Sequence, residues 1–102
     1  MALPPRDHAV TLADAAAHTR RYREAKVSAV TAGAFHADQV LALLGQPGCA
    51  ALRIYHGRAA DGTPSLVLVG VDAGGADLTA GLVLENAWPC PPFCSAPNGL
   101  TR

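Results

Sequence analysis

The sequence has few of the large side chains from which a hydrophobic core is usually built. Among its 102 residues are two phenylalanines, two tyrosines, one tryptophan and one methionine, and alanine supplies much of the apolar half of the composition. A chain this short holds one domain and buries only about two-thirds of the surface that it exposes when unfolded. Because the core is thin, we expect the protein to complete its burial by self-association or by binding a metal.

The sequence also lacks an excess of either charge, a long apolar run and an apolar leader. Eight Lys and Arg balance eight Asp and Glu, so the net charge does not favour binding to nucleic acid or to an anionic membrane surface. No run approaches the roughly 20 apolar residues of a spanning helix, and Met1 to Asp7 has no signal-peptide character. These absences predict a cytoplasmic protein without a membrane partner, in a compartment where thiols are normally reduced.

Recognisable catalytic motifs are absent as well. The chain contains no Walker-type loop, no G-x-G-x-x-G, no G-x-S-x-G and no H-E-x-x-H. Three cysteines and four histidines could in principle form a nucleophile and its base, but they offer too many accidental pairs to indicate one. The sequence therefore favours a protein that is not an enzyme.

Regular structure is predicted to begin after residue 9. Residues 1–9 carry two prolines and no periodicity, which predicts a flexible arm, and residues 10–102 are expected to form a single α+β domain. Thr11 followed by Asp14 resembles a helix-capping pair. The alanine-rich run from there to about Ala25 has strong helix propensity, so it predicts the first helix.

A second helix is expected from about Asp38 to Gly45, where the sequence is apolar on most sides. His36 stands where an N-cap or the residue before it would lie. Pro47 cannot continue the helix and Gly48 can turn the chain, so the helix should end before them. Between the two helices, the stretch from Lys26 to Phe35 is predicted to be a loop or a short strand.

The clearest pattern is a β-hairpin with strands over 50–57 and 65–72, joined across Asp61-Gly62. The first strand alternates apolar and polar residues. The second is uninterruptedly apolar, so it should be central and covered on both faces. A symmetric turn would place three side chains of the first strand on one face with three valines of the second. These are Leu52, Ile54 and His56 with Val71, Val69 and Val67.

The expected fold class is thus α+β, with two helices packed on a small antiparallel sheet. A third strand is expected over 82–85, beside the central one. The tail over 89–102 carries four prolines, which exclude a helix and a central strand and predict an irregular segment.

Four segments of the chain resemble one group of known proteins. They are Gln46-Pro47-Gly48-Cys49, Arg53-Ile54-Tyr55-His56-Gly57, the run from Leu66 to Ala73, and Glu85 leading to Cys90-Pro91-Pro92-Phe93-Cys94-Ser95 and Asn98. In these the chain is similar to a family of short, uncharacterised bacterial proteins, common in the Bacteroidetes, with a C-terminal Cys-Pro-Pro-x-Cys tail. The family has no known function, so no catalytic role follows. The resemblance implies that Cys49, Cys90 and Cys94 belong to a recurring pattern.

Cys90 and Cys94 are separated by three residues, which is a spacing that zinc-binding cysteine pairs use. Cys49 could supply a third thiolate and His36 a fourth ligand. A fully extended polyproline segment would hold the Cα atoms of Cys90 and Cys94 about 12 Å apart, too far for one metal or one disulfide. The two cysteines can share one metal or one disulfide only if the segment between them bends. A cis peptide before Pro91 or Pro92 is the natural candidate for that bend.

Three interpretations of the cysteines stay open at this point. They are small packing residues, a zinc site formed by Cys49, Cys90, Cys94 and His36, or a disulfide or redox switch.

Two functional hypotheses follow. The leading one is a non-enzymatic structural or interaction module that forms a homo-oligomer through its hairpin or the adjacent sheet edge, because a two-sided apolar strand needs cover. The Cys-Pro tail is the alternative cover for that strand, and the sequence leaves room for an unidentified protein partner. The second hypothesis is a small thiol-based protein, zinc-binding or redox-responsive, that uses Cys90 and Cys94.

Overall fold

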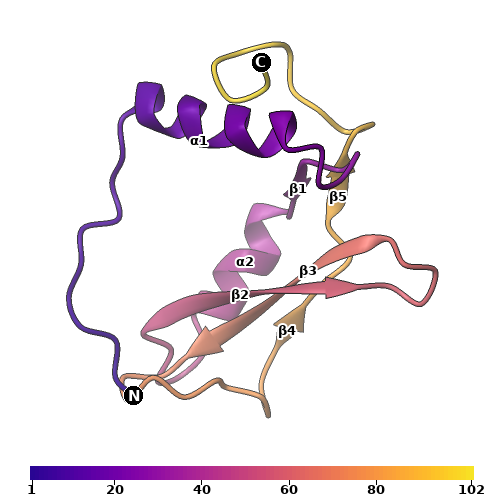
Figure 1. The fold of residues 1–102 in the computed structure, drawn as a ribbon. Coiled ribbons are helices and arrows are strands. Elements are labelled where there is room, and N and C mark those ends of the chain that lie inside the picture. The colour runs from indigo at the N-terminus through magenta and orange to yellow at the C-terminus, as the bar shows by residue number, and fades with distance from the viewer. The chain divides into compact units, whose positions relative to one another are not determined.

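A computed structural model describes all residues, 1–102, and has an α+β fold with two helices and two small antiparallel sheets (Figure 1). The chain folds into two compact units, one formed by Met1–Pro5 and Ala34–Trp88 and the other by Arg6–Gly33 and Pro89–Arg102. None of the helices is long and apolar enough to cross a membrane. The elements are α1 (Leu12–Glu24), β1 (Ala32–Ala34), α2 (Ala37–Leu44), β2 (Ala51–Arg58), β3 (Pro64–Val71), β4 (Val83–Leu84) and β5 (Trp88–Cys90).

Helix α1, in the second unit, begins at the predicted cap. The side chain of Thr11 accepts a hydrogen bond of 3.1 Å from the backbone N–H of Asp14, which is one of the donors that a first helical turn leaves unpaired. The helix ends at Glu24, followed by Ala25 as its C-cap, and none of its residues is buried.

Helix α2, in the first unit, supplies the core. Leu43 is fully buried and packs with Leu68 of β3 and Leu84 of β4. His36 occupies the N-cap position, as predicted, although its side chain makes no capping hydrogen bond. The helix ends at Leu44, and Gly48 turns the chain with a φ of 79°, a conformation that glycine adopts without steric cost.

Strand β3 is central in a three-stranded antiparallel sheet, with β2 on one side and β4 on the other, as the apolar run predicted. The prediction of which side chains of the two hairpin strands share a face, however, is wrong. The strands pair one residue away from the symmetric register, with Ala51 opposite Val71. Leu52, Ile54 and His56 consequently lie opposite Gly70, Leu68 and Leu66.

The geometry of the turn explains this register. The N–H of Gly62 donates to the carbonyl of Ala59 at 2.9 Å, and the N–H of Ala59 donates to the carbonyl of Thr63 at 2.8 Å. Gly62 has a φ of 88°. This pattern is typical of a three-residue hairpin loop, in which a glycine takes the left-handed conformation. The loop is therefore centred on Asp61, and a one-residue shift moves every side chain of a strand to the other face.

Both faces of β3 are covered, as predicted. Helix α2 covers the face that carries Leu68, while on the opposite face Val69 and Val71 are only 3% and 0% exposed. The segment after β3 folds back beside the strand: Asp77 forms a β-bridge with Val71, and the N–H of Leu78 donates to the carbonyl of Gly70. The chain itself thus buries the second face, without a second copy.

The strands β1 and β5 form a separate two-stranded sheet. Next to it, the N–H of Thr31 donates to the carbonyl of Cys90 at 2.8 Å. β5 contains Pro89 and pairs with only one strand, so it is not a central strand. This agrees with the prediction that the prolines of the tail exclude a central strand. For the stretch from Lys26 to Phe35, which was predicted to be a loop or a short strand, the structure has a loop that ends in the short strand β1.

Gln46 connects the end of α2 to the start of β4. Its Nε2 donates to the carbonyl of Leu43 at 2.8 Å, and its Oε1 accepts from the N–H of Leu82 at 2.7 Å. The Leu43 carbonyl also accepts a longer hydrogen bond, of 3.4 Å, from the backbone N–H of Gln46, so the side-chain amide adds a second donor at the end of the helix. Gly81 makes room for the amide, because a Cβ atom there would overlap with Oε1 of Gln46.

We expect Gln46→Ala to lower the free energy of unfolding by about 1 kcal/mol, since it removes the two hydrogen bonds through which the amide joins the end of α2 to the start of β4. Chemical denaturation monitored by circular dichroism measures the change. Gln39→Ala, in the exposed first turn of α2, is the matched control and should leave stability within about 0.5 kcal/mol. Equal effects of the two substitutions would contradict this role of Gln46.

Candidate functional site

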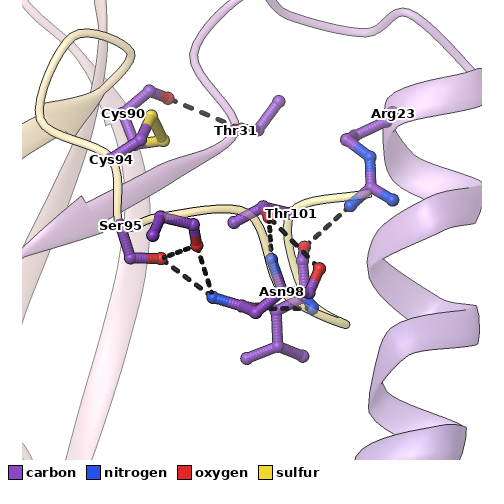
Figure 2. Close-up of a disulfide and its surroundings, with 9 residues drawn as sticks. Arg23, Thr31, Cys90, Cys94, Ser95, Asn98 and Thr101 are labelled. Carbon is purple, nitrogen blue, oxygen red and sulfur yellow. Dashed lines mark hydrogen bonds between the residues drawn. A yellow bond between two sulfur atoms is a disulfide. The ribbon is translucent and has the colours of Figure 1, made fainter.

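Cys90 and Cys94 form a disulfide, with their Cα atoms 4.8 Å apart (Figure 2). The peptide bonds before Pro91 and before Pro92 are both cis. The predicted bend between the two cysteines is therefore present. The N–H of Phe93 donates to the carbonyl of Pro89 at 2.8 Å, which closes the turn. Cys90 is half-buried, whereas Cys94 is exposed.

The segment that follows the disulfide, residues 95–101, is organised by one side chain, and we refer to it as the C-terminal loop (Figure 2). The Nδ2 of Asn98 donates to Oγ of Ser95 at 2.9 Å and to the carbonyl of Ala96 at 3.1 Å. Its Oδ1 accepts from the N–H of Leu100, and its backbone N–H donates to Oγ1 of Thr101, both at 2.8 Å. Asn98 is suited to this role because its short amide bonds readily to the backbone next to it.

The C-terminal loop docks on α1 within the second unit. Arg23 donates a hydrogen bond of 2.8 Å from Nη1 to the carbonyl of Leu100, and Gly99 lies against Leu12 and Ala16. Arg23 lies in the last turn of α1, and its guanidinium holds the end of the chain against the helix.

The other two predicted metal ligands lie in the first unit. Cys49 is a free cysteine whose thiol donates to the carbonyl of Ala51 at 3.4 Å and whose Sγ lies against Gly70. The Nε2 of His36 accepts a hydrogen bond of 3.3 Å from the indole N–H of Trp88.

The structure thus joins two of the four predicted ligands directly, through the disulfide. No group of three or more His, Cys, Asp or Glu side chains is arranged to hold a metal ion. Zinc binds cysteine as thiolate, so a disulfide-bonded pair does not serve it. The zinc site of Cys49, Cys90, Cys94 and His36 concerns the reduced chain and stays a prediction.

A polar cluster lies on the Val69 face of the sheet, and the sequence did not predict it. Arg53 donates from Nη1 to Oδ1 of Asp77 at 2.5 Å and to the carbonyl of Gly75 at 3.3 Å. The hydroxyl of Tyr55 donates to Oδ2 of the same carboxylate. Arg53 and Tyr55 are alternate residues of β2, but only the register of the sheet reveals that they share a face with Asp77.

These hydrogen bonds shift the ionisation of all three groups. The hydrogen bond from Tyr55, supported by Arg53, lowers the pKa of Asp77, although partial burial opposes it. The same bond raises the pKa of Tyr55, and Asp77 raises the pKa of Arg53. The cluster therefore holds a stable ion pair and a neutral phenol. It joins β2 to the segment after β3 and offers no activated base or nucleophile.

A lowered pKa makes the contribution of Asp77 to stability depend on pH. The contribution is complete above the ordinary carboxyl pKa of about 4 and is lost as the pH falls through the lowered value of the folded state. We expect the wild type to lose more stability than Asp77→Asn as the pH falls from about 5 to about 2. Urea denaturation midpoints across this range measure the difference. Asp38→Asn is the control, and identical pH profiles of the wild type and Asp77→Asn would contradict the assignment.

The outer edge of β2 is a second candidate surface, which we call the β2 edge (residues 51–58). β2 is paired only with β3, so one side of this eight-residue strand has no strand partner. Its side chains Leu52, Ile54 and Tyr55 are 36%, 50% and 46% exposed. The strand contains no proline, one of the usual devices that prevent an edge from pairing. The edge is open to another strand.

Comparisons with protein-family models, with curated proteins and with solved structures found no match. The resemblance to the bacterial family with the Cys-Pro-Pro-x-Cys tail stays a prediction.

Proposed function

We propose that the protein is a non-enzymatic interaction module that self-associates through the β2 edge. The observation that carries the proposal is the length of that unpaired strand, with exposed apolar side chains among its polar ones, beside a small core. Its free backbone N–H and C=O groups bond to water in a single chain and to a neighbouring strand in an oligomer. Exposed Ile54, at the middle of the strand, would gain burial in that arrangement.

The charges of the β2 edge are compatible with a second copy of this chain. In a two-fold symmetric antiparallel pair, each strand faces its own sequence reversed. Pairing centred on Ile54 sets Leu52 opposite His56 and Arg53 opposite Tyr55, so that no two arginines face each other. Arg53 is in any case paired with Asp77 in its own chain. Two copies can therefore join their sheets without repulsion between facing like charges.

We expect the wild type to form an oligomer whose population rises with concentration, and Ile54→Lys to weaken the association about tenfold or more, since it places a charge at the centre of the interface. Light scattering and sedimentation over a wide concentration range measure both. Leu41→Lys is the matched control, because Leu41 is 67% exposed on α2 and away from the edge. Circular dichroism checks folding, and Ile54→Thr replaces the lysine variant if that variant unfolds. A strict monomer at all concentrations would overturn the proposal.

A second candidate function, a redox-responsive thiol protein, is favoured by the Cys90–Cys94 disulfide. The cytoplasmic location predicted from the sequence makes a permanent structural disulfide unusual and a cycling one more in keeping with the compartment. In this candidate the pair opens to two thiols by exchange with other thiols. The zinc-binding form of the candidate uses the same two thiols after reduction.

Intact mass under native conditions tests this second candidate. We expect reduction to add the mass of two hydrogen atoms, in the wild type and equally in Cys49→Ser, because one disulfide opens and Cys49 is free. Zinc added to the reduced chain, with and without a chelator, tests the metal-binding form. A chain that gains neither hydrogens on reduction nor a removable metal mass would exclude the thiol candidate.

A further inference from the structure

We infer that Cys90–Cys94 is a thiol–disulfide exchange site attacked at Cys94, and that its redox state sets how firmly the C-terminal loop docks on α1. The inference rests on the second candidate function and deepens it. It names the reacting sulfur, the class of co-reactant, which is a low-molecular-weight thiol such as glutathione, and the structural change that reduction produces.

The two cysteines differ in exposure. Cys94 is exposed, and so are the three residues before it, Pro91, Pro92 and Phe93. Cys90 is half-buried at the end of β5, where its carbonyl accepts hydrogen bonds from the N–H of Thr31 at 2.8 Å and from its Oγ1 at 3.5 Å. Since a thiolate must approach the sulfur that it attacks, Cys94 is the favoured target.

Each disulfide is opened in two exchange steps. A small-molecule thiolate attacks Sγ of Cys94, the bond to Cys90 breaks, and Cys90 leaves as a thiolate that takes up a proton. A second small-molecule thiolate then attacks the outer sulfur of the mixed disulfide, so that Cys94 leaves and is protonated. The two small thiols are oxidised to one disulfide, and the two protein sulfurs are reduced.

The disulfide lies between two anchored segments of the second unit. On one side, the carbonyl of Cys90 is held by Thr31. On the other side, the C-terminal loop is held by the bond from Arg23 to Leu100 and by the contact of Gly99 with α1. A cross-link shortens the chain that connects two such anchors and so limits the positions the loop can reach.

Reduction removes that limit. The five-residue segment from Cys90 to Cys94 becomes a longer and freer tether, which lowers the effective concentration of the loop at its docking place on α1. The loop then spends more time undocked, although each of its contacts remains available.

Amide hydrogen exchange at Leu100 and Thr101 reports the docking, because both N–H groups donate to Asn98 in the ordered loop. We expect reduction by a small dithiol to speed exchange at both about tenfold. Cys49→Ser should behave as the wild type does. The double variant Cys90→Ser/Cys94→Ser should exchange at the fast rate with or without reductant, and unchanged exchange on reduction would overturn the coupling.

A second pair of variants tests the docking contact itself. Arg23→Gln removes the bond to Leu100 and should speed exchange in the oxidised chain, whereas Arg20→Gln, on an exposed position of the same helix, should not. Equal rates in the two variants would show that α1 does not hold the loop.

The site of attack is tested with the single-cysteine chains. In a Cys49→Ser background, glutathione disulfide should form a mixed disulfide several-fold faster on Cys90→Ser, where only Cys94 remains, than on Cys94→Ser. Equal or reversed rates would overturn the assignment of Cys94.

The outcomes separate this inference from the candidate on which it rests. If the intact mass rises by two hydrogens while amide exchange stays constant, the docking inference fails and the redox candidate stands. If no hydrogens are gained, both fail.

Discussion

Strand β3 is buried on both faces, and the arrangement of the first unit follows from that burial. An apolar strand with no solvent-exposed face needs a neighbouring strand along each edge and other parts of the protein packed over each face. Strands β2 and β4 occupy the edges, and α2 covers the side that carries Leu68. On the other side Val69 and Val71 are buried. The segment after β3 pairs along the strand through the bridge of Asp77 with Val71, and Asp77 binds Arg53 and Tyr55 of β2.

The second unit is held together in a different way. All five buried hydrophobic residues, namely Leu43, Leu68, Val69, Val71 and Leu84, belong to the first unit. In the second unit, α1 has no buried residue; the unit contains the Thr11 cap, the contact of α1 with the C-terminal loop, and the disulfide. Covalent and hydrogen-bonded constraints commonly stabilise small structures that lack a core. A unit of this kind is sensitive to the loss of a single cross-link, which is the physical basis of the redox role that we propose for Cys90 and Cys94.

The two candidate functions therefore use two parts of the chain that differ physically. The β2 edge is attached to the buried core and offers backbone groups in a rigid array, which suits pairing with another strand. The disulfide lies in a segment whose contacts are few and solvent-exposed, which suits a response to small thiols. Neither surface needs an activated base, and the hydrogen-bonded cluster at Asp77 supplies none.

Local chemistry in the sequence by itself determined most of the elements. The Thr11 cap, Pro47 with Gly48, and the apolar run of β3 act on their own neighbours, so they place both helices and the central strand without knowledge of the rest. The need for a bend between Cys90 and Cys94 also follows from the length of an extended chain. Tertiary structure decided what depends on pairing over distance. The left-handed Gly62 set the hairpin register, and with it which side chains face the core. The meeting of Arg53 with Asp77 and of Arg23 with Leu100 required the folded chain, because residues separated by 24 and 77 positions come together only through the packing of everything between them.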